Sequence, residues 1–80
     1  MTPEEIEDLA DSVGQVKTLP ATFDKRFTNM LWYRSKQEVK QPLSPSQIKW
    51  VFKLAYKYRR QIPATYEHYK FEILIEKDKP

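Results

Sequence analysis

The sequence PLSPSQIKWVFKLAYKYRRQIP, residues 42–63, carries both a start signal and a stop signal for a helix. Ser44 can accept a hydrogen bond from first-turn amides that lack an intrahelical partner, and Gln47 stands where a capping box places its second side chain. The proline that follows Ser44 suits the first helical position, because its missing N–H group costs nothing there. Pro63 disfavours the α conformation at the residue before it. These signals predict a helix over residues 45–62.

The side chains of this helix divide into an apolar side and a cationic side when they are placed at about 100° per residue. The apolar arc has the spacing of a buried helical face and contains Ile48, Val51, Phe52, Ala55, Tyr58 and Ile62. The opposite side carries a row of cations, here called the basic stripe: Lys49, Lys53, Lys57 and Arg60. Trp50 and Tyr56 flank the stripe, one on each edge. The stripe is either an ordinary solvated helix face or a binding surface for an anionic polymer, and the wheel alone does not separate the two.

The net charge of +3 conceals a strong asymmetry along the chain. Residues 1–11 contain five acidic side chains and no Lys or Arg, whereas residues 12–66 contain eleven basic residues and only Asp24 and Glu38 as acids. A segment this cationic attracts polyanions whatever the average charge of the chain. The distribution therefore favours a binding role for the basic stripe, with nucleic acid as the leading candidate partner.

A helix is also predicted over residues 3–13. Thr2 and Glu5 have the capping-box spacing at its start, and Gly14 is placed to end it. Its expected core face follows the i, i+3, i+4, i+7 pattern and contains Ile6, Leu9, Ala10 and Val13. Its acidic residues lie near the N-terminal end, where the helix dipole favours them. The same acids could alternatively dock a basic partner or this chain's own basic stripe.

A further helix is predicted over residues 20–35. One side of its wheel gathers Phe23, Phe27, Met30, Leu31 and Arg34. We therefore expect its phenylalanines to belong to the core rather than to stack on bases. Trp32 and Tyr33 must then partly face elsewhere.

The C-terminal segment, residues 65–76, is ambiguous. Phe71, Ile73 and Ile75 alternate with charged residues as in a strand. No other segment offers a partner strand, and an unpaired strand is unstable alone. We expect a helix and a monomer, whereas a strand would require a second copy of the chain. The predicted fold class is all-α, a small bundle of three to four helices in a single domain over residues 1–80.

Residues that support catalysis or metal binding are scarce. The chain has no cysteine, one histidine (His68) and one glycine (Gly14), so a thiolate zinc site and a glycine-rich phosphate loop are excluded. The acidic N-terminal segment does not resemble a secretion signal, and no apolar run reaches the length of a membrane span. We predict a cytoplasmic non-enzyme with no cofactor, no metal and no membrane partner.

Two segments, TLPATFDKRFTNMLWYRSKQE (18–38) and LSPSQIKWVFKLAYKYRRQI (43–62), resemble the small helical proteins encoded beside the UvsW recombination helicase of T-even bacteriophages. The resemblance extends over most of the chain and includes no catalytic motif. It implies a helical bundle similar to the junction-binding module of the RuvA type. It also implies a role near branched DNA, recombination or the neighbouring helicase, in the cytoplasm of the host cell.

The leading hypothesis is a non-enzymatic nucleic-acid-binding accessory module that acts with a DNA helicase in phage recombination, repair or replication. The basic stripe would neutralise phosphates, while Trp50 or Tyr56 would stack on an exposed base. Binding to single-stranded or branched DNA is expected to be weak and independent of sequence, because phosphate contacts carry no direct sequence information.

Two alternatives stay open. The first is a protein–protein adaptor that regulates a helicase without binding DNA, through the acidic first helix or the apolar residues near 71–75. The second is a basic amphipathic helix that lies on a membrane. It ranks last, because the helix over 45–62 can bury its apolar face within a bundle.

Overall fold

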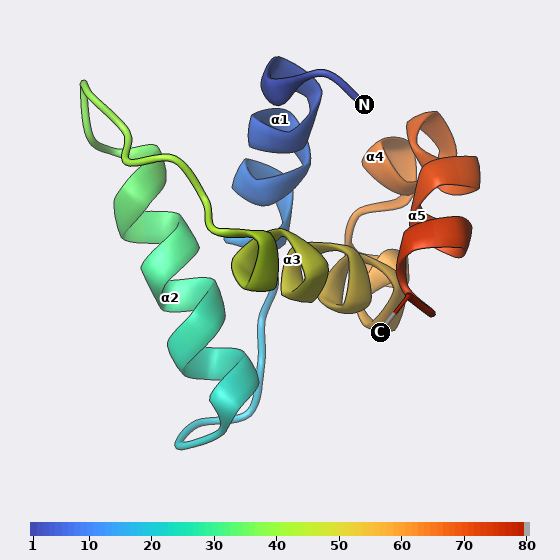
Figure 1. Cartoon of the computed structure of the whole chain (residues 1–80). Helices are drawn as coiled ribbons and strands as arrows, with labels where there is room; N and C mark the ends of the chain where they lie inside the picture. Colours follow the sequence, from blue (N-terminus) through green and yellow to red (C-terminus); the bar gives the residue numbers. More distant parts are fainter. Residues whose placement is uncertain (80) are drawn as a thin grey trace.

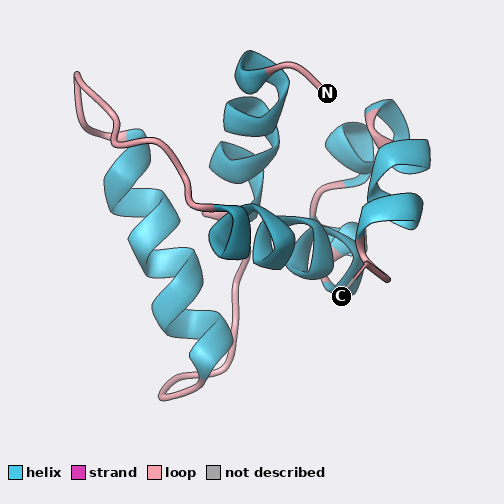
Figure 2. Ribbon diagram, in the orientation of Figure 1, coloured by secondary structure: helices cyan, strands magenta, loops and turns pink. Residues whose placement is uncertain are grey.

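Every regular element between residues 1 and 79, the part of the chain that the computed structural model describes, is helical. In chain order the elements are α1 (Pro3–Val13), α2 (Phe23–Ser35), α3 (Pro45–Lys57), the 3-10 turn η1 (Arg59–Gln61), α4 (Pro63–His68) and α5 (Lys70–Glu76) (Figures 1 and 2). The all-α prediction is confirmed, and the segment with the strand-like alternation is helical.

Helix α3 holds the bundle together. It crosses the middle of the molecule, with α2 on one side and α4 and α5 on the other (Figure 1). Both α1 and α5 pack directly on α3, and α1 also packs on α2. The fully buried side chains come from all four of these helices and include Leu9, Leu31, Leu54 and Ile73.

The buried side of α3 is wider than the wheel predicts. Val51, Phe52 and Ala55 are buried as expected, but so is Leu54, which lies outside the predicted apolar arc. The reason is that α3 is packed by α1 and α5, so more than one side of the helix is removed from water. The spacing of apolar residues within one helix does not indicate how many other helices pack on it, so this wider burial could not be predicted from the wheel.

Both predicted capping boxes form. At the start of α3, the amide of Gln47 donates to Ser44 Oγ at 3.2 Å, and the amide of Ser44 donates to Gln47 Oε1 at 2.9 Å. Thr2 and Glu5 make the equivalent reciprocal pair at the start of α1. These local hydrogen bonds satisfy first-turn amides that have no partner inside the helix.

The other helix boundaries differ from the predicted ones. Helix α2 begins at Phe23 rather than at residue 20, because Ala21 has a φ of 62° and Thr22 caps the helix. The predicted helix over 45–62 ends at Lys57, and the chain continues through Tyr58 (φ −107°, ψ 25°) into η1.

The predicted C-terminal helix is interrupted by a tyrosine in the same way. Tyr69 has φ −112° and ψ 20°, and it separates α4 from α5. Its hydroxyl donates to Asp8 Oδ2 of α1 at 2.8 Å. Tyr58, at the end of α3, likewise donates to Asp24 Oδ2 of α2, at 2.7 Å. Both interruptions therefore coincide with a tyrosine that is bonded to another helix.

Gly14 ends α1, and its backbone is right-handed, with φ −62°. Its lack of a side chain matters because α1 approaches α2 closely at this point. A Cβ atom at Gly14 would lie 2.9 Å from the backbone nitrogen of Trp32 and 3.1 Å from the carbonyl carbon of Leu31. Those neighbours are backbone atoms, so the two helices could not keep this spacing around a larger residue.

Candidate nucleic-acid interface

The structure divides the basic stripe. Lys49, Lys53 and Lys57 lie four residues apart on α3 and therefore share one helix face. Arg60 lies beyond the interruption at Tyr58, in η1, so the helix wheel does not fix its position relative to the three lysines. Lys57 and Arg60 are exposed, and the other two are partly buried.

Lys57 is already neutralised by an acid of the same chain. Its Nζ lies 2.6 Å from Asp24 Oδ2, which also accepts from Tyr58. Burial raises the pKa of Asp24, but the hydrogen bonds from Lys57 and Tyr58 outweigh that effect and hold the pKa below its ordinary 3.8. The hydrogen bond with Asp24 raises the pKa of Lys57. Both groups are charged near neutral pH, and the pair offers a phosphate less net charge than a free lysine does.

The two aromatic residues predicted to flank the stripe are engaged within the protein. The ring centroid of Tyr56 lies 4.3 Å from the guanidinium carbon of Arg59 and 4.5 Å from Lys77 Nζ. The ring of Trp50 packs against Phe23 with centroids 4.8 Å apart, and Lys53 Nζ lies 5.3 Å from its centre. A base could stack on either ring only by displacing one of these neighbours.

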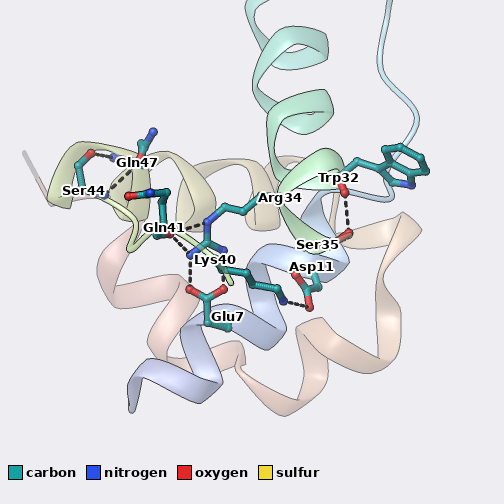
Figure 3. A network of polar contacts seen from close by, with 9 residues as sticks. All are labelled: Glu7, Asp11, Trp32, Arg34, Ser35, Lys40, Gln41, Ser44 and Gln47. Carbon is teal, nitrogen blue, oxygen red and sulfur yellow. Dashed lines mark hydrogen bonds and ion pairs between the residues drawn. The ribbon is translucent and has the colours of Figure 1, made fainter. Parts of the chain in front are cut away.

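Two acids of α1, Glu7 and Asp11, are likewise paired with basic side chains of this chain. The guanidinium of Arg34 donates to both carboxylate oxygens of Glu7 and to the carbonyl oxygen of Gln41 (Figure 3). Lys40 Nζ pairs with Asp11 Oδ2 at 3.3 Å. This network joins α1, α2 and the connection to α3. It gives part of the acidic cluster a structural role, which the sequence analysis did not identify.

Several cations remain without a carboxylate partner. Ion pairs engage Arg34, Lys40, Lys57, Lys77 and Lys79. Within residues 1–79 the remaining lysines and arginines form no ion pair. They include Lys49 and Lys53 on α3, Lys25 and Arg26 on α2, Lys17 before that helix and Lys36 directly after it. Of these, Lys17 and Lys25 line one hollow together with Trp32, and Lys36 Nζ lies over the Trp32 ring. These three lysines form a second cationic surface, which the sequence analysis did not propose as a site.

An open hollow of about 650 Å³ lies on this second surface, between the end of α1 and α2. Its lining residues are Gly14, Gln15, Val16, Lys17, Thr18, Lys25, Asn29 and Trp32. The spacing i, i+4, i+7 and i+11 of Lys25, Asn29, Trp32 and Lys36 puts them on one face of α2. This spacing is the feature of the sequence from which the second cationic surface could have been predicted.

The described part of the chain, residues 1–79, contains no cluster of three or more histidine, cysteine or acidic side chains suited to a metal ion. His68 is exposed at the end of α4. None of the helices in this part is long and apolar enough to span a bilayer.

Comparisons of the chain with protein-family models, with curated proteins and with solved structures gave no match. The function must therefore be inferred from the surfaces just described.

Proposed function

We propose that this protein is a non-enzymatic nucleic-acid-binding accessory module. The observation that carries the proposal is the separation of its charges. Cations without an ion-pair partner in the described residues lie on α2 and on both sides of it, on α3, in η1 and at the start of α5, whereas Glu7, Asp8 and Asp11 of α1 are bonded to side chains of the same chain. The protein thus presents positive charge to solvent while its own polar contacts engage part of its negative charge.

Such a surface binds nucleic acid by releasing the counterions that surround the phosphates. On α3, the unpaired Lys49 and Lys53 contact the sugar–phosphate backbone, with Trp50 between them in the sequence. Phosphate contacts set the position of the protein on DNA without reading its sequence. The binding is therefore weak, sensitive to salt and insensitive to sequence.

The resemblance to the proteins encoded beside the UvsW helicase supports a more specific context. In this proposal the module acts on single-stranded or branched DNA together with a helicase, during phage recombination, repair or replication. Trp32 and Trp50 are 42% and 38% exposed. These tryptophans support the same preference, because bases are available for stacking only where strands are unpaired.

Fluorescence anisotropy with labelled single-stranded, duplex and branched DNA, each at two salt concentrations, tests the proposal. We expect binding to all three that weakens as salt increases, with single-stranded or branched DNA bound more tightly than duplex. A second single strand of scrambled sequence serves as the matched control and should bind equally well. No binding at low salt, or a strong dependence on sequence, would contradict the proposal.

One observation favours a second candidate function, an adaptor that contacts a helicase. The side chains of Phe71 and Ile75 on α5 are 79% and 61% exposed, although both are large and apolar. We expect Phe71→Ser with Ile75→Ser to abolish any effect of the protein on helicase unwinding while leaving its DNA affinity unchanged. Val39→Ser changes a comparably exposed apolar residue elsewhere and is the control. Unaltered unwinding in the double variant would rule out this contact.

A further inference from the structure

The hollow beside α2 has the size of a small-ligand site. Its volume of about 650 Å³ lies within the range of roughly 300–1,000 Å³ that is typical of ligand pockets. It is open to solvent rather than enclosed, as a site for one unit of a longer polymer must be. One of its lining residues is Gly14, where α1 lies so close to α2 that a Cβ atom would be 2.9 Å from the backbone nitrogen of Trp32.

The lining of the hollow suits an anion that also carries hydrogen-bonding groups. Lys17 and Lys25 contribute two ammonium groups with no carboxylate partner in the described residues, and no acidic side chain lines the hollow. Gln15 and Asn29 contribute amides, which can both donate and accept. Thr18 also lines the hollow, and its Oγ1 is a buried atom without a hydrogen-bond partner. Phosphates match the ammonium groups, and the edge of a base matches the amides.

Trp32 gives the hollow an aromatic side. It is 42% exposed, and its ring makes an edge-on contact with Tyr33 at 5.1 Å between centroids. Lys36 Nζ lies 5.2 Å from the ring centre. A cation–π contact of this exposed kind corresponds to only about a 2- to 5-fold preference. Stacking of a base contributes roughly 5- to 150-fold in affinity. A base can therefore displace Lys36, and the released ammonium group stays close enough to meet a phosphate.

Trp50 is less suited to this role. Phe23 packs on its ring with centroids 4.8 Å apart and is itself stacked on Phe27. The prediction that both phenylalanines belong to the core is right for Phe27, which is buried, and wrong for Phe23, which is 45% exposed because it lies in the first turn of α2. A base that reached this face of Trp50 would have to displace an aromatic side chain that also stacks on Phe27. At Trp32 it would displace one mobile lysine side chain.

We propose that the hollow binds one base of a single-stranded nucleic acid, stacked on Trp32, with its neighbouring phosphates at Lys17 and Lys25. This inference rests on the proposed function. It assigns the single-strand site to α2, separate from the basic stripe on α3 where stacking on Trp50 or Tyr56 was expected. The stripe then contacts phosphates only.

Two single-tryptophan variants test the assignment, because the chain has only two tryptophans. Trp50→Phe leaves Trp32 as the reporter, and Trp32→Phe leaves Trp50. Each is titrated with an oligothymidylate of about eight nucleotides, a length within the range of single-strand binding sites. We expect binding to quench the emission of Trp32 strongly and that of Trp50 only weakly. Circular dichroism confirms that both variants stay helical.

A companion measurement compares affinities by anisotropy. Trp32→Ala should weaken single-strand binding by roughly 5- to 150-fold and leave binding to blunt duplex unchanged, whereas Trp50→Ala should have little effect on either. Binding of the oligonucleotide without quenching of Trp32, or quenching of Trp50 alone, would overturn this inference and leave the proposed function intact. Absence of any binding by the unaltered protein would overturn both.

Discussion

Replacing Glu7 with glutamine is expected to destabilise the protein by about 2–3 kcal/mol. Removing one partner of a buried ion pair typically costs about 3–5 kcal/mol, because the other charge stays buried without compensation. The side chain of Arg34 is 8% exposed and fits that case, while that of Glu7 is 31% exposed, so solvent reduces the cost. Chemical denaturation of the variant and the unaltered protein measures the difference.

Asp11→Asn is the matched control. It also replaces an acid of α1 by its amide and removes an ion pair, but its partner Lys40 is 28% exposed and lies 3.3 Å away. Ion pairs near the surface contribute at most about 1 kcal/mol. A loss of stability in Glu7→Gln no greater than that in Asp11→Asn would mean that the Arg34 contact does not hold α1 and α2 together.

The ion pair of Glu7 with Arg34 should also make the stability of the protein depend on pH. Hydrogen bonding from Arg34 lowers the pKa of Glu7 below its ordinary 4.5, against the opposing effect of burial. A carboxyl group whose pKa is lower in the folded state stabilises the fold fully above its unfolded pKa. That contribution is lost as the pH falls through the lowered value. The free energy of unfolding should therefore fall below about pH 4.5 less steeply in Glu7→Gln than in the unaltered protein.

The features that sequence analysis predicted correctly are local ones. The capping boxes at Thr2 and Ser44 connect residues three positions apart, so the sequence alone specifies them. The interruptions at Tyr58 and Tyr69 could not be predicted in this way. Their hydroxyls bond to Asp24 and to Asp8, which are 34 and 61 residues away along the chain.

The candidate nucleic-acid interface likewise depends on contacts between residues that are distant in the sequence. A helix wheel shows which cations share a face, but it does not show which of them an acid neutralises. Lys57 and Asp24 are 33 residues apart, and Arg34 and Glu7 are 27 apart. The wheel placed Arg34 on the apolar side of its helix, and its burial there is explained by Glu7. The hollow beside Trp32 likewise depends on the close contact of α1 and α2 at Gly14.

Three triple variants should separate the two cationic surfaces from the effect of net charge. The first changes Lys49, Lys53 and Arg60 to glutamine, and the second changes Lys17, Lys25 and Lys36. Lys57 is kept in all three, because its partner Asp24 is only 15% exposed and would lose its ion pair in a largely buried place. The third changes Lys40, Lys70 and Lys79, which lie outside both surfaces. Lys40 and Lys79 are also ion-paired, but their partners Asp11 and Glu76 are 36% and 37% exposed, so water can solvate them once the lysines are gone. Each triple lowers the net charge by the same amount, so any difference among them reports position.

Each phosphate contact contributes roughly 0.7 to 0.9 to the slope of log K against log salt, through counterion release. Losing three contacts should therefore flatten the slope by about 2 to 3 units. We expect the triple at Lys17, Lys25 and Lys36 to flatten the slope for single strands, which occupy the hollow. The triple at Lys49, Lys53 and Arg60 should flatten the slope for duplex and single strands alike. The third should change the slope little. None of the nine side chains is fully buried: Lys25, Lys40, Lys49 and Lys53 are partly buried and the other five are exposed. Surface changes usually cost within about 0.5 kcal/mol each, and circular dichroism checks that all three proteins stay folded. Equal losses in all three would mean that diffuse charge alone attracts DNA, and that the basic stripe is an ordinary solvated helix face.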